Sequence, residues 1–443
     1  MTKHPVYLML GIWLIAALML LILPFQLLAR PLTGYGVLVL AAFFIAFVTG
    51  SLLVPPAPRA DSAASYNLDG MDYAVAERVL IAIGLISIIA FCLDLSGRNL
   101  LDISGGQELR SQRANTLLRA QASSSTAWFQ IAFLTYPAGY AYIALHTIYV
   151  RAISCWRLSL FGFLPILLSI LSMGGRSPLL YAMTIFGLAY LTRRKSIRSS
   201  NSGAKSHHLI KPKSILIVLG ITLSAIAAGY YFSVIFIVRS EAMGGPEAMF
   251  KLAESVWGVG FKGSLSEQIF TIFGERLTYL IFIFSWYFVQ GLVIASNLFS
   301  DYNGPLQFGI YGIDLVSALV RRGEPETVAH GFLALLSLGT YGFFPSAFGS
   351  LFVDFGLAGL FMTVLWGYAA TLCYRKIKFE RKGKWLIFAP FVTAGIVFSL
   401  INTPLGFANG LVSHAWMLLT FSLLRQHRSN PTIQAPASLP TSE

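Results

Sequence analysis

Charged residues are scarce in this chain: Asp, Glu, Lys and Arg together make up 12% of 443 positions, whereas hydrophobic residues make up 56%. Soluble domains carry about twice that share of charge, so the composition excludes an ordinary soluble protein. Acids are the scarcer charged class, with 19 against 32 basic residues, which gives a net charge of +13. We attribute this charge to short membrane-protein loops and anionic lipid, and we expect no nucleic-acid partner.

Cysteines are also few, and Cys92, Cys155 and Cys373 lie far apart in apolar surroundings. This spacing predicts neither a disulfide framework nor a zinc site. The chain lacks a P-loop, the Rossmann glycine pattern, a His-Glu-x-x-His helix and a nucleophile elbow. We therefore expect none of the soluble enzyme classes that these motifs define, and no metal or other cofactor.

Long apolar segments are abundant, and the mean hydropathy is +0.69. A bilayer is crossed by about 20 apolar residues in a helix. Segments of this kind lie at 6–29, 34–54, 75–93, 127–150, 153–172, 177–192, 214–237, 347–373, 385–401 and 410–424. The fold class predicted is therefore an all-α polytopic membrane protein with about 10 transmembrane helices.

A further apolar pair, Leu277–Leu298 and Pro305–Val320, would raise the number to 12. Polar residues interrupt this pair, namely Gln290, Asn297, Asp301, Asn303 and Asp314. We therefore predict a re-entrant or interfacial hairpin for it.

Two basic loops predict the orientation. Seven basic residues and no acid lie between Arg193 and Lys213, and six basic residues against Glu380 lie between Arg375 and Lys384. Cytoplasmic loops carry such charge, so both loops and both termini are predicted to be cytoplasmic. The prediction is one membrane domain over 1–424, with a large outer loop at about 238–346, and a disordered cytoplasmic tail over 425–443.

The run Met173-Gly174-Gly175-Arg176-Ser177-Pro178 lies at a predicted outer boundary. Two glycines permit a tight turn, and Pro178 suits the first turn of a helix, so Arg176 is expected beside free backbone N–H groups. A guanidinium there is suited to bidentate binding of a diphosphate. The alternative is that Arg176 only extends to the membrane interface.

The two outer loops supply further candidates. Arg110, Arg113 and Arg119 would share one side of a helix and could touch a lipid diphosphate, or they form an ordinary solvated face. The long loop carries the other charged candidates, which are Arg239, Glu275, Arg276, Arg321, Arg322 and His330. An acid or histidine beside arginines can deprotonate a hydroxyl while a departing phosphate is stabilised, although His330 alone is more typical of a structural or solvent role.

Asp354 lies within an apolar span, where an ionisable group is costly unless it is paired or faces a wet cavity. Small residues around it, at 346, 347, 349, 350, 356 and 359, would allow close helix contact. Two interpretations are open: Asp354 ties down a neighbouring segment, or it takes part in chemistry.

The segment Gly339-Thr340-Tyr341 with Phe348-Gly349-Ser350-Leu351-Phe352-Val353-Asp354-Phe355-Gly356-Leu357-Ala358-Gly359 resembles the signature of bacterial oligosaccharide repeat-unit polymerases, the O-antigen polymerases. The Gly-Gly-Arg run before a basic loop is also similar to that family, as is the layout of spans with one dominant outer loop. The resemblance covers most of the chain by layout, and two short segments by residue pattern.

The resemblance implies a membrane glycosyltransferase of the GT-C type at the periplasmic face of the bacterial inner membrane. It would transfer a growing glycan from undecaprenyl diphosphate onto a new lipid-linked repeat unit, with a chain-length regulator as partner. Under this hypothesis Arg176 and Arg276 stabilise the leaving diphosphate, Glu275 or His330 is the base, and the substrate-binding residues are Arg239, Arg113, Tyr341 and Asp354. Two alternatives are an O-antigen ligase, which transfers glycan to lipid A core, and a transporter of lipid-linked sugar or polysaccharide.

Overall fold

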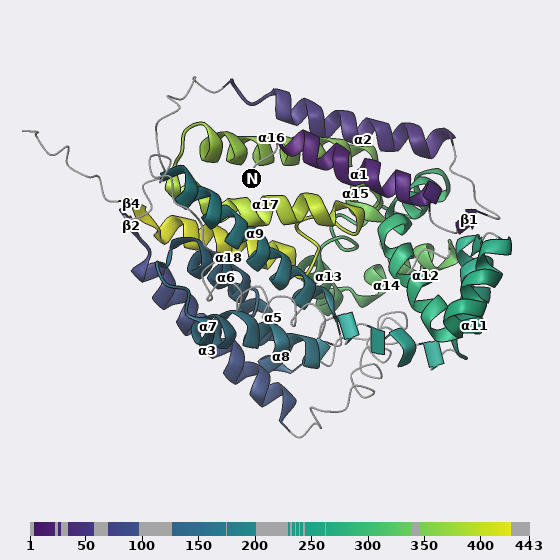
Figure 1. The fold of residues 1–443 in the computed structure, drawn as a ribbon, viewed down its shortest axis with the longest axis horizontal. Helices are drawn as coiled ribbons and strands as arrows, with labels where there is room; N and C mark the ends of the chain where they lie inside the picture. The colour runs from purple at the N-terminus through teal and green to yellow at the C-terminus, as the bar shows by residue number, and fades with distance from the viewer. Residues whose placement is uncertain are drawn as a thin grey trace, which may run out of the picture.

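The fold is nearly all helical in the computed structural model, which describes residues 4–22, 25–27, 34–56, 70–96, 126–173, 175–200, 263–338 and 345–426, and 229–261 with short gaps (Figure 1). The first half contains α1 (Pro5–Ile22), α2 (Gly34–Leu52), α3 (Ala74–Leu95), α5 (Ala127–Thr135), α6 (Ala138–Tyr149), α7 (Cys155–Arg157), α8 (Leu164–Met173) and α9 (Ser177–Ser200). The second half contains α11 (Pro246–Leu252), α12 (Gly263–Asp301), α13 (Asp314–Gly323), α14 (Pro325–Ser337), α15 (Ser346–Phe355), α16 (Gly359–Lys378), α17 (Phe388–Val397) and α18 (Gly410–Leu423). Short strands β1 (Phe25–Leu27) and β3 (Val259–Phe261) pair antiparallel, as do β2 (Met71–Asp72) and β4 (Arg425–Gln426).

Several helices are long and apolar enough to cross a membrane. Within the described residues seven segments qualify, and the helix at Gly410–Leu423 is shorter but apolar. The seven are Pro5–Ile22, Gly34–Leu52, Ala74–Leu95, Cys155–Met173, Gln268–Asp301, Ser346–Lys378 and Gly383–Leu400. The prediction of a multi-pass helical membrane protein is therefore confirmed at this level, while most of the predicted span at 214–237 lies outside the described residues.

The predicted hairpin of 277–298 with 305–320 is wrong in form. Residues 277–298 belong to α12, one long helix that kinks at Gly274, where φ is 69°. Residues 305–320, the predicted second half of the hairpin, form a loop and most of α13, a short amphipathic helix. The residues of α13 are all at least partly exposed. Polar residues on α12, such as Gln290 and Asn297, are buried against other helices rather than placed at an interface.

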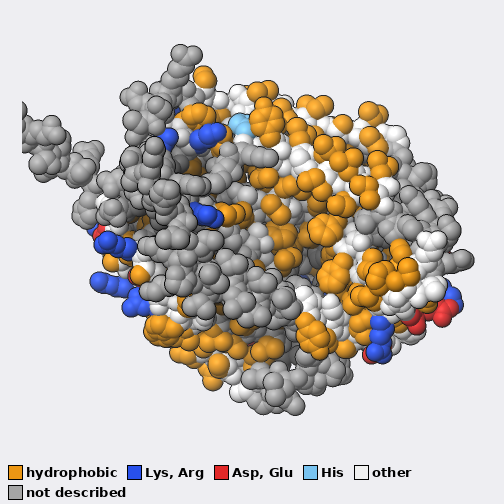
Figure 2. All heavy atoms as spheres, in the orientation of Figure 1, with side chains coloured by type: hydrophobic (Ala, Val, Ile, Leu, Met, Phe, Trp, Pro, Cys, Tyr) orange, Lys and Arg blue, Asp and Glu red, His pale blue; other side chains and the backbone are white. Residues whose placement is uncertain are grey.

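One end of the helix bundle, which we call the basic end, collects the positively charged turns (Figure 2). Arg193 of α9 donates to the carbonyls of Thr147, Val150 and Arg151, which caps the end of α6. The Tyr149 hydroxyl donates to the carbonyls of Gly383 and Lys384, and Arg375 donates to the Pro55 carbonyl. His4 contacts Tyr374, so the first and last described residues lie at this same end, with the β2–β4 pair.

The β2–β4 pair also corrects the predicted tail. Arg425 and Gln426 form a strand that pairs with Asp72 and Met71, because the chain after α18 meets the segment before α3. Only 427–443, the rest of the predicted disordered tail, lies outside the described residues.

Two parallel helices, α2 and α16, pack at backbone contact through glycines. A Cβ atom at Gly367 would overlap the Phe47 carbonyl oxygen, and one at Gly50 would overlap the Val364 carbonyl oxygen. Further along the pair, Thr371 donates to Ser51 at 2.8 Å. Without water to drive association in a bilayer, such close contact is the main source of helix affinity.

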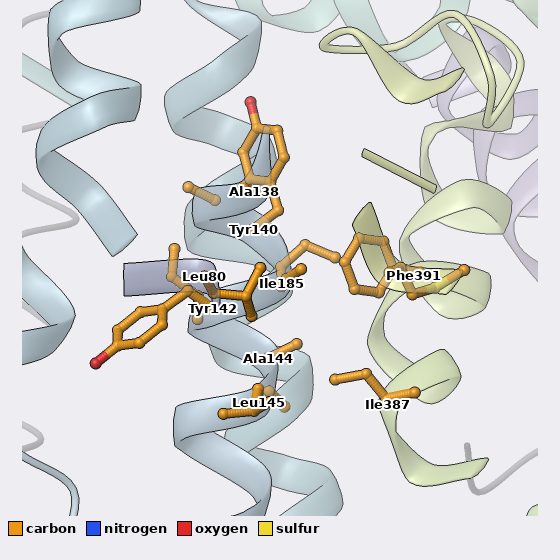
Figure 3. Close-up of a cluster of buried hydrophobic side chains, with 14 of the residues drawn as sticks. Leu80, Ala138, Tyr140, Tyr142, Ala144, Leu145, Ile185, Ile387 and Phe391 are labelled. Atoms are coloured by element: carbon orange, nitrogen blue, oxygen red, sulfur yellow. The ribbon is translucent and has the colours of Figure 1, made fainter. Parts of the chain in front are cut away.

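The core centres on α6, all of whose residues are buried. Figure 3 shows Ile185 of α9 and Phe391 of α17 beside it, with Ile387 toward the lower end of the view. Tyr140 and Tyr142 leave α6 with their hydroxyls in different directions, and Tyr140 extends past Ala138 toward the start of the helix. This orientation places the Tyr140 hydroxyl away from the basic end.

The α2–α16 contact predicts that Gly367→Ala destabilises the protein by about 1–3 kcal/mol, because the added methyl forces the two backbones apart. The midpoint of thermal unfolding of the purified protein in detergent measures this. Gly187→Ala on α9 is the matched control, since a Cβ there meets nothing within 4 Å. Equal midpoints for the two variants would contradict the assigned contact.

Candidate functional site

Four breaks between consecutive helices, among those in the described part of the chain, lie close to one another. They lie at Tyr136–Pro137 between α5 and α6, at 302–313 between α12 and α13, at Gly356 after α15, and at 401–409 between α17 and α18. Pro137 cannot donate a backbone hydrogen bond, and Gly356 adopts a positive φ of 58°, which ends α15. Backbone interrupted in this way is tolerated in a bilayer only where protein or a water-filled cavity satisfies it.

The loop 302–313 is held by the end of α15. The Asp354 side chain is 2% exposed, and its two carboxylate oxygens accept from the backbone N–H groups of Tyr311, at 3.0 Å, and Gly312, at 2.9 Å. The backbone carbonyls of Val353 and Asp354 accept from Gln307 and Phe308. Asp354 therefore ties down a neighbouring segment, as one of its two sequence interpretations predicts.

The same loop touches the interruption between α17 and α18. A Cβ atom at Gly406 would overlap the Gly312 carbonyl oxygen. Asn409, with φ of 57°, starts α18 and donates through Nδ2 to the Phe133 carbonyl at 2.8 Å. Segments far apart in sequence are thus assembled around one point of the bundle.

Asp314 lies at this point. Its side chain is exposed, yet burial among the surrounding helices raises its pKa to about 6, against a hydrogen bond from the Asn409 backbone N–H that lowers it. We call Asp314, with Asn409 and Tyr136 beside it, the Asp314 cluster. Tyr136 is close enough to interact electrostatically with Asp314, and its hydroxyl lies 3.5 Å from the Ala408 carbonyl.

A row of aromatic rings leads from the Asp314 cluster to α9. Tyr136 and Tyr140 have ring centroids 6.1 Å apart, and Tyr140 and Tyr181 are 4.9 Å apart in an edge-to-face contact. Tyr181 also contacts Phe407 of the 401–409 loop. Arg176 precedes Tyr181 by five residues, about 7.5 Å along a helix.

Arg176 lies immediately before α9, so the predicted helix start is confirmed. Its guanidinium carbon lies 3.9 Å from the centroid of the Phe236 ring, in a cation–π contact. Phe236 in turn contacts Phe284 and Tyr287 of α12. The guanidinium is therefore held against an aromatic cluster rather than extended freely into solvent.

The acids and bases predicted on the long loop have other surroundings. The Glu275 carboxylate accepts from the Glu247 backbone N–H at 3.2 Å, at the start of α11, and Arg276 forms a 2.8 Å ion pair with Glu241. His330 is exposed on α14. Arg113, Arg239 and Tyr341 lie outside the described residues, as do the other arginines of the loop at 97–125.

Asp314, Asn409 and Tyr136 were not singled out as site residues from the sequence. Asp314 stood only as a polar interruption of an apolar segment, Tyr136 falls within the predicted span at 127–150, and Asn409 falls between the predicted spans at 385–401 and 410–424. The available signal was the occurrence of helix breakers beside polar residues, at Pro137 inside one span and at Asn402-Thr403-Pro404 between two others. Within the described part of the chain no group of three or more His, Cys, Asp or Glu side chains could hold a metal ion.

The anchoring role of Asp354 predicts that Asp354→Ala destabilises the protein by about 2–4 kcal/mol, since two backbone N–H groups lose their charged acceptor. Thermal unfolding in detergent provides the measurement. Asp301→Ala, at the exposed end of α12, is the control and should leave the midpoint unchanged. A tolerated Asp354→Ala would mean that water replaces the carboxylate at no cost.

Comparison with known proteins identifies no relative: no family model, no curated protein and no solved structure matches this chain. What its residues can do is therefore inferred from the geometry around Asp314 and Arg176.

Proposed function

We propose that this chain is an integral membrane glycosyltransferase that polymerises undecaprenyl-diphosphate-linked oligosaccharide repeat units into a bacterial surface polysaccharide. The observation that carries the proposal is the Asp314 cluster, which the Tyr136–Tyr140–Tyr181 row connects to the part of α9 that follows Arg176. A carboxylate such as that of Asp314 and a guanidinium such as that of Arg176 are the two kinds of group that glycosyl transfer from a lipid diphosphate requires.

In the proposed reaction, a hydroxyl oxygen of the acceptor sugar forms a bond to the anomeric carbon of the donor, and the bond from that carbon to the diphosphate oxygen breaks. Asp314 takes the hydroxyl proton, and Arg176 stabilises the negative charge on the departing undecaprenyl diphosphate. The transition state is oxocarbenium-like, so a fixed guanidinium contributes most as the leaving group departs. Losing one such preorganised donor costs on the order of 100-fold in rate.

This assignment gives Asp314 the role of base that Glu275 and His330 held in the sequence hypothesis. Glu275 is engaged with the start of α11, and the charge of Arg276 is already compensated by Glu241. Arg276 is therefore a weaker partner for a diphosphate than Arg176.

The distribution of charge supports a periplasmic reaction. Basic turns predict that the basic end faces the cytoplasm. Arg176 and the Asp94–Thr126–Ser172 hydrogen bonds lie at opposite helix ends from those turns, because α9 runs from Arg176 to Arg193. Lipid-linked repeat units at the periplasmic face would reach this side.

A transporter is the second candidate, and the helix interruptions favour it. Discontinuous membrane helices and ionisable residues near their ends are typical of substrate sites in secondary transporters. The breaks at Tyr136–Pro137 and 401–409, with Asp354 buried in α15, fit that description. An O-antigen ligase has the same chemistry as the polymerase and differs in its acceptor.

Deletion of the gene is predicted to reduce the surface polysaccharide ladder to core plus one repeat, and a plasmid copy should restore it. Gel electrophoresis of the polysaccharide provides the measurement. Plasmids carrying Arg176→Ala or Asp314→Asn should fail to restore the ladder at normal protein levels, whereas Asp301→Asn should restore it. Loss of all attached repeats with accumulation of lipid-linked polymer would identify a ligase instead, and repeat units retained at the cytoplasmic face would identify a transporter.

The raised pKa of Asp314, about 6, predicts the pH dependence of polymerisation. A base acts as the carboxylate, so the rate should be maximal above pH 6 and fall about tenfold per pH unit below it. Polymer formation by the purified protein in vesicles between pH 4.5 and 8 measures this. A rate that is constant down to pH 5 would exclude Asp314 as the base.

A further inference from the structure

The turn that joins α6 to α7, residues 150–154, is held from two sides at the basic end. Arg193 of α9 donates to three backbone carbonyls at the end of α6 and in the turn. The buried side chain of His146 accepts through Nε2 from the backbone N–H of Ser154, at 3.1 Å. An arginine therefore holds the carbonyls of this turn, and a histidine holds its last N–H group.

The hydrogen bond from Ser154 determines where His146 carries its proton. A backbone N–H can only donate, so Nε2 must present its lone pair to it. The one ring proton of the neutral imidazole is then on Nδ1, which lies 3.4 Å from a carboxylate oxygen of Glu77 and 3.5 Å from the Tyr142 hydroxyl. Both ring nitrogens are thus engaged in the neutral form of the side chain.

The charged groups around His146 come from three helices. Glu77 of α3 attracts a positive imidazole, whereas Arg157 of α7 and Arg193 of α9 repel it. Arg157 also pairs with the Glu77 oxygen that faces His146, at 3.6 Å. A proton on Nε2 would bring a second positive charge to this carboxylate in a buried position, and would set two N–H donors against each other. Protonation of His146 therefore breaks the hydrogen bond from Ser154.

We infer that His146 is a pH-sensitive switch at the basic end, which holds the turn at 150–154 when neutral and releases it when protonated. A histidine in water has a pKa of about 6.5, so acidification below that value favours release. The switch responds to the compartment that the basic end faces, which is predicted to be the cytoplasm.

Release of this turn frees one end of the segment that leads to Arg176. The turn continues into α7, the π-helix η1 (Leu158–Phe163) and α8, which ends three residues before Arg176. The switch itself is independent of the proposed glycosyl transfer, whereas an effect of release on catalysis rests on that proposal.

The test compares wild type with His146→Gln, because the glutamine Oε1 can accept from the Ser154 N–H and the side chain does not titrate. Hydrogen–deuterium exchange of a peptide covering 150–157 is measured in the full-length protein in detergent at pH 7.5, 6.5 and 5.5, without substrate. The ratio of the two exchange rates at one pH removes the intrinsic effect of pH. Each release takes up one proton, so below pH 6.5 exchange of wild type should rise relative to the variant by up to about tenfold per pH unit.

Two controls accompany this comparison. His330→Gln removes an exposed histidine on α14 and should give the same exchange at 150–157 as wild type. Within wild type, the turn at 379–384 is the reference, since Tyr149 binds two of its carbonyls and it contains no histidine. Exchange at 150–157 should rise relative to this turn as the pH falls, a result that does not depend on the stability of any variant.

The contrary outcomes are equally distinct. Exchange at 150–157 that keeps a constant ratio to both references from pH 7.5 to 5.5 would overturn the switch. A ratio that falls with acid would also overturn it, and would mean that Glu77 stabilises protonated His146 in the folded protein. Because no substrate is present, loss of the polymerase hypothesis would leave this result unchanged.

Discussion

The hydrogen bonds that Asp354 accepts are the constraint on which the candidate site depends. A bilayer supplies no water to an interrupted helix, so the backbone of 302–313 needs partners from the protein. The end of α15 supplies them twice, through the carboxylate to Tyr311 and Gly312 and through its own carbonyls to Gln307 and Phe308. Asp314, the first residue of α13, follows Gly312 by two residues. The hydrogen bonds that hold Gly312 therefore also fix the position of Asp314.

Close backbone contact makes this arrangement possible. At Gly291 a Cβ would overlap the Leu400 carbonyl oxygen, and at Gly406 it would overlap that of Gly312. The first contact joins α12 to the end of α17, and the second joins the two loops that surround Asp314. Larger residues would push these segments apart. The glycines thus contribute to the chemistry by fixing distances rather than by contacting a substrate.

The two ends of the bundle use charge differently. At the basic end, Arg193 and Arg375 satisfy backbone carbonyls, and hydrogen bonds from Lys376 and Lys382 lower the pKa of Glu380 to about 2. These residues hold the turns between helices together, and their positive charge predicts that this end faces the cytoplasm. Away from that end, Arg176 is stacked on Phe236, and Asp94 accepts from the hydroxyls of Thr126 and Ser172. Isolated charges in specific contacts are what a binding site requires, whereas clustered and mutually compensated charges suit a membrane boundary.

The amino-acid sequence by itself determined the class of protein, most of the helices and the start of α9 after Arg176. These properties depend on local quantities, namely the length of apolar runs, the clustering of Lys and Arg and the backbone preferences of Gly and Pro. It also indicated that Asp354 needs a partner, because burial of a lone carboxylate is costly anywhere in an apolar span.

Only the tertiary structure decided which segment that partner is, and that Asp314, Tyr136 and Asn409 meet. These residues lie on helices separated by tens to hundreds of positions, and no local pattern encodes which helix interruptions come to the same depth. For the same reason the sequence assigned Leu277–Leu298 to a hairpin: its polar residues suggested an interface, whereas packing against other helices buries them within α12. Several arrangements of the helices are compatible with the same local preferences. Contacts between distant parts of the chain, added over the whole bundle, decide which one is the most stable.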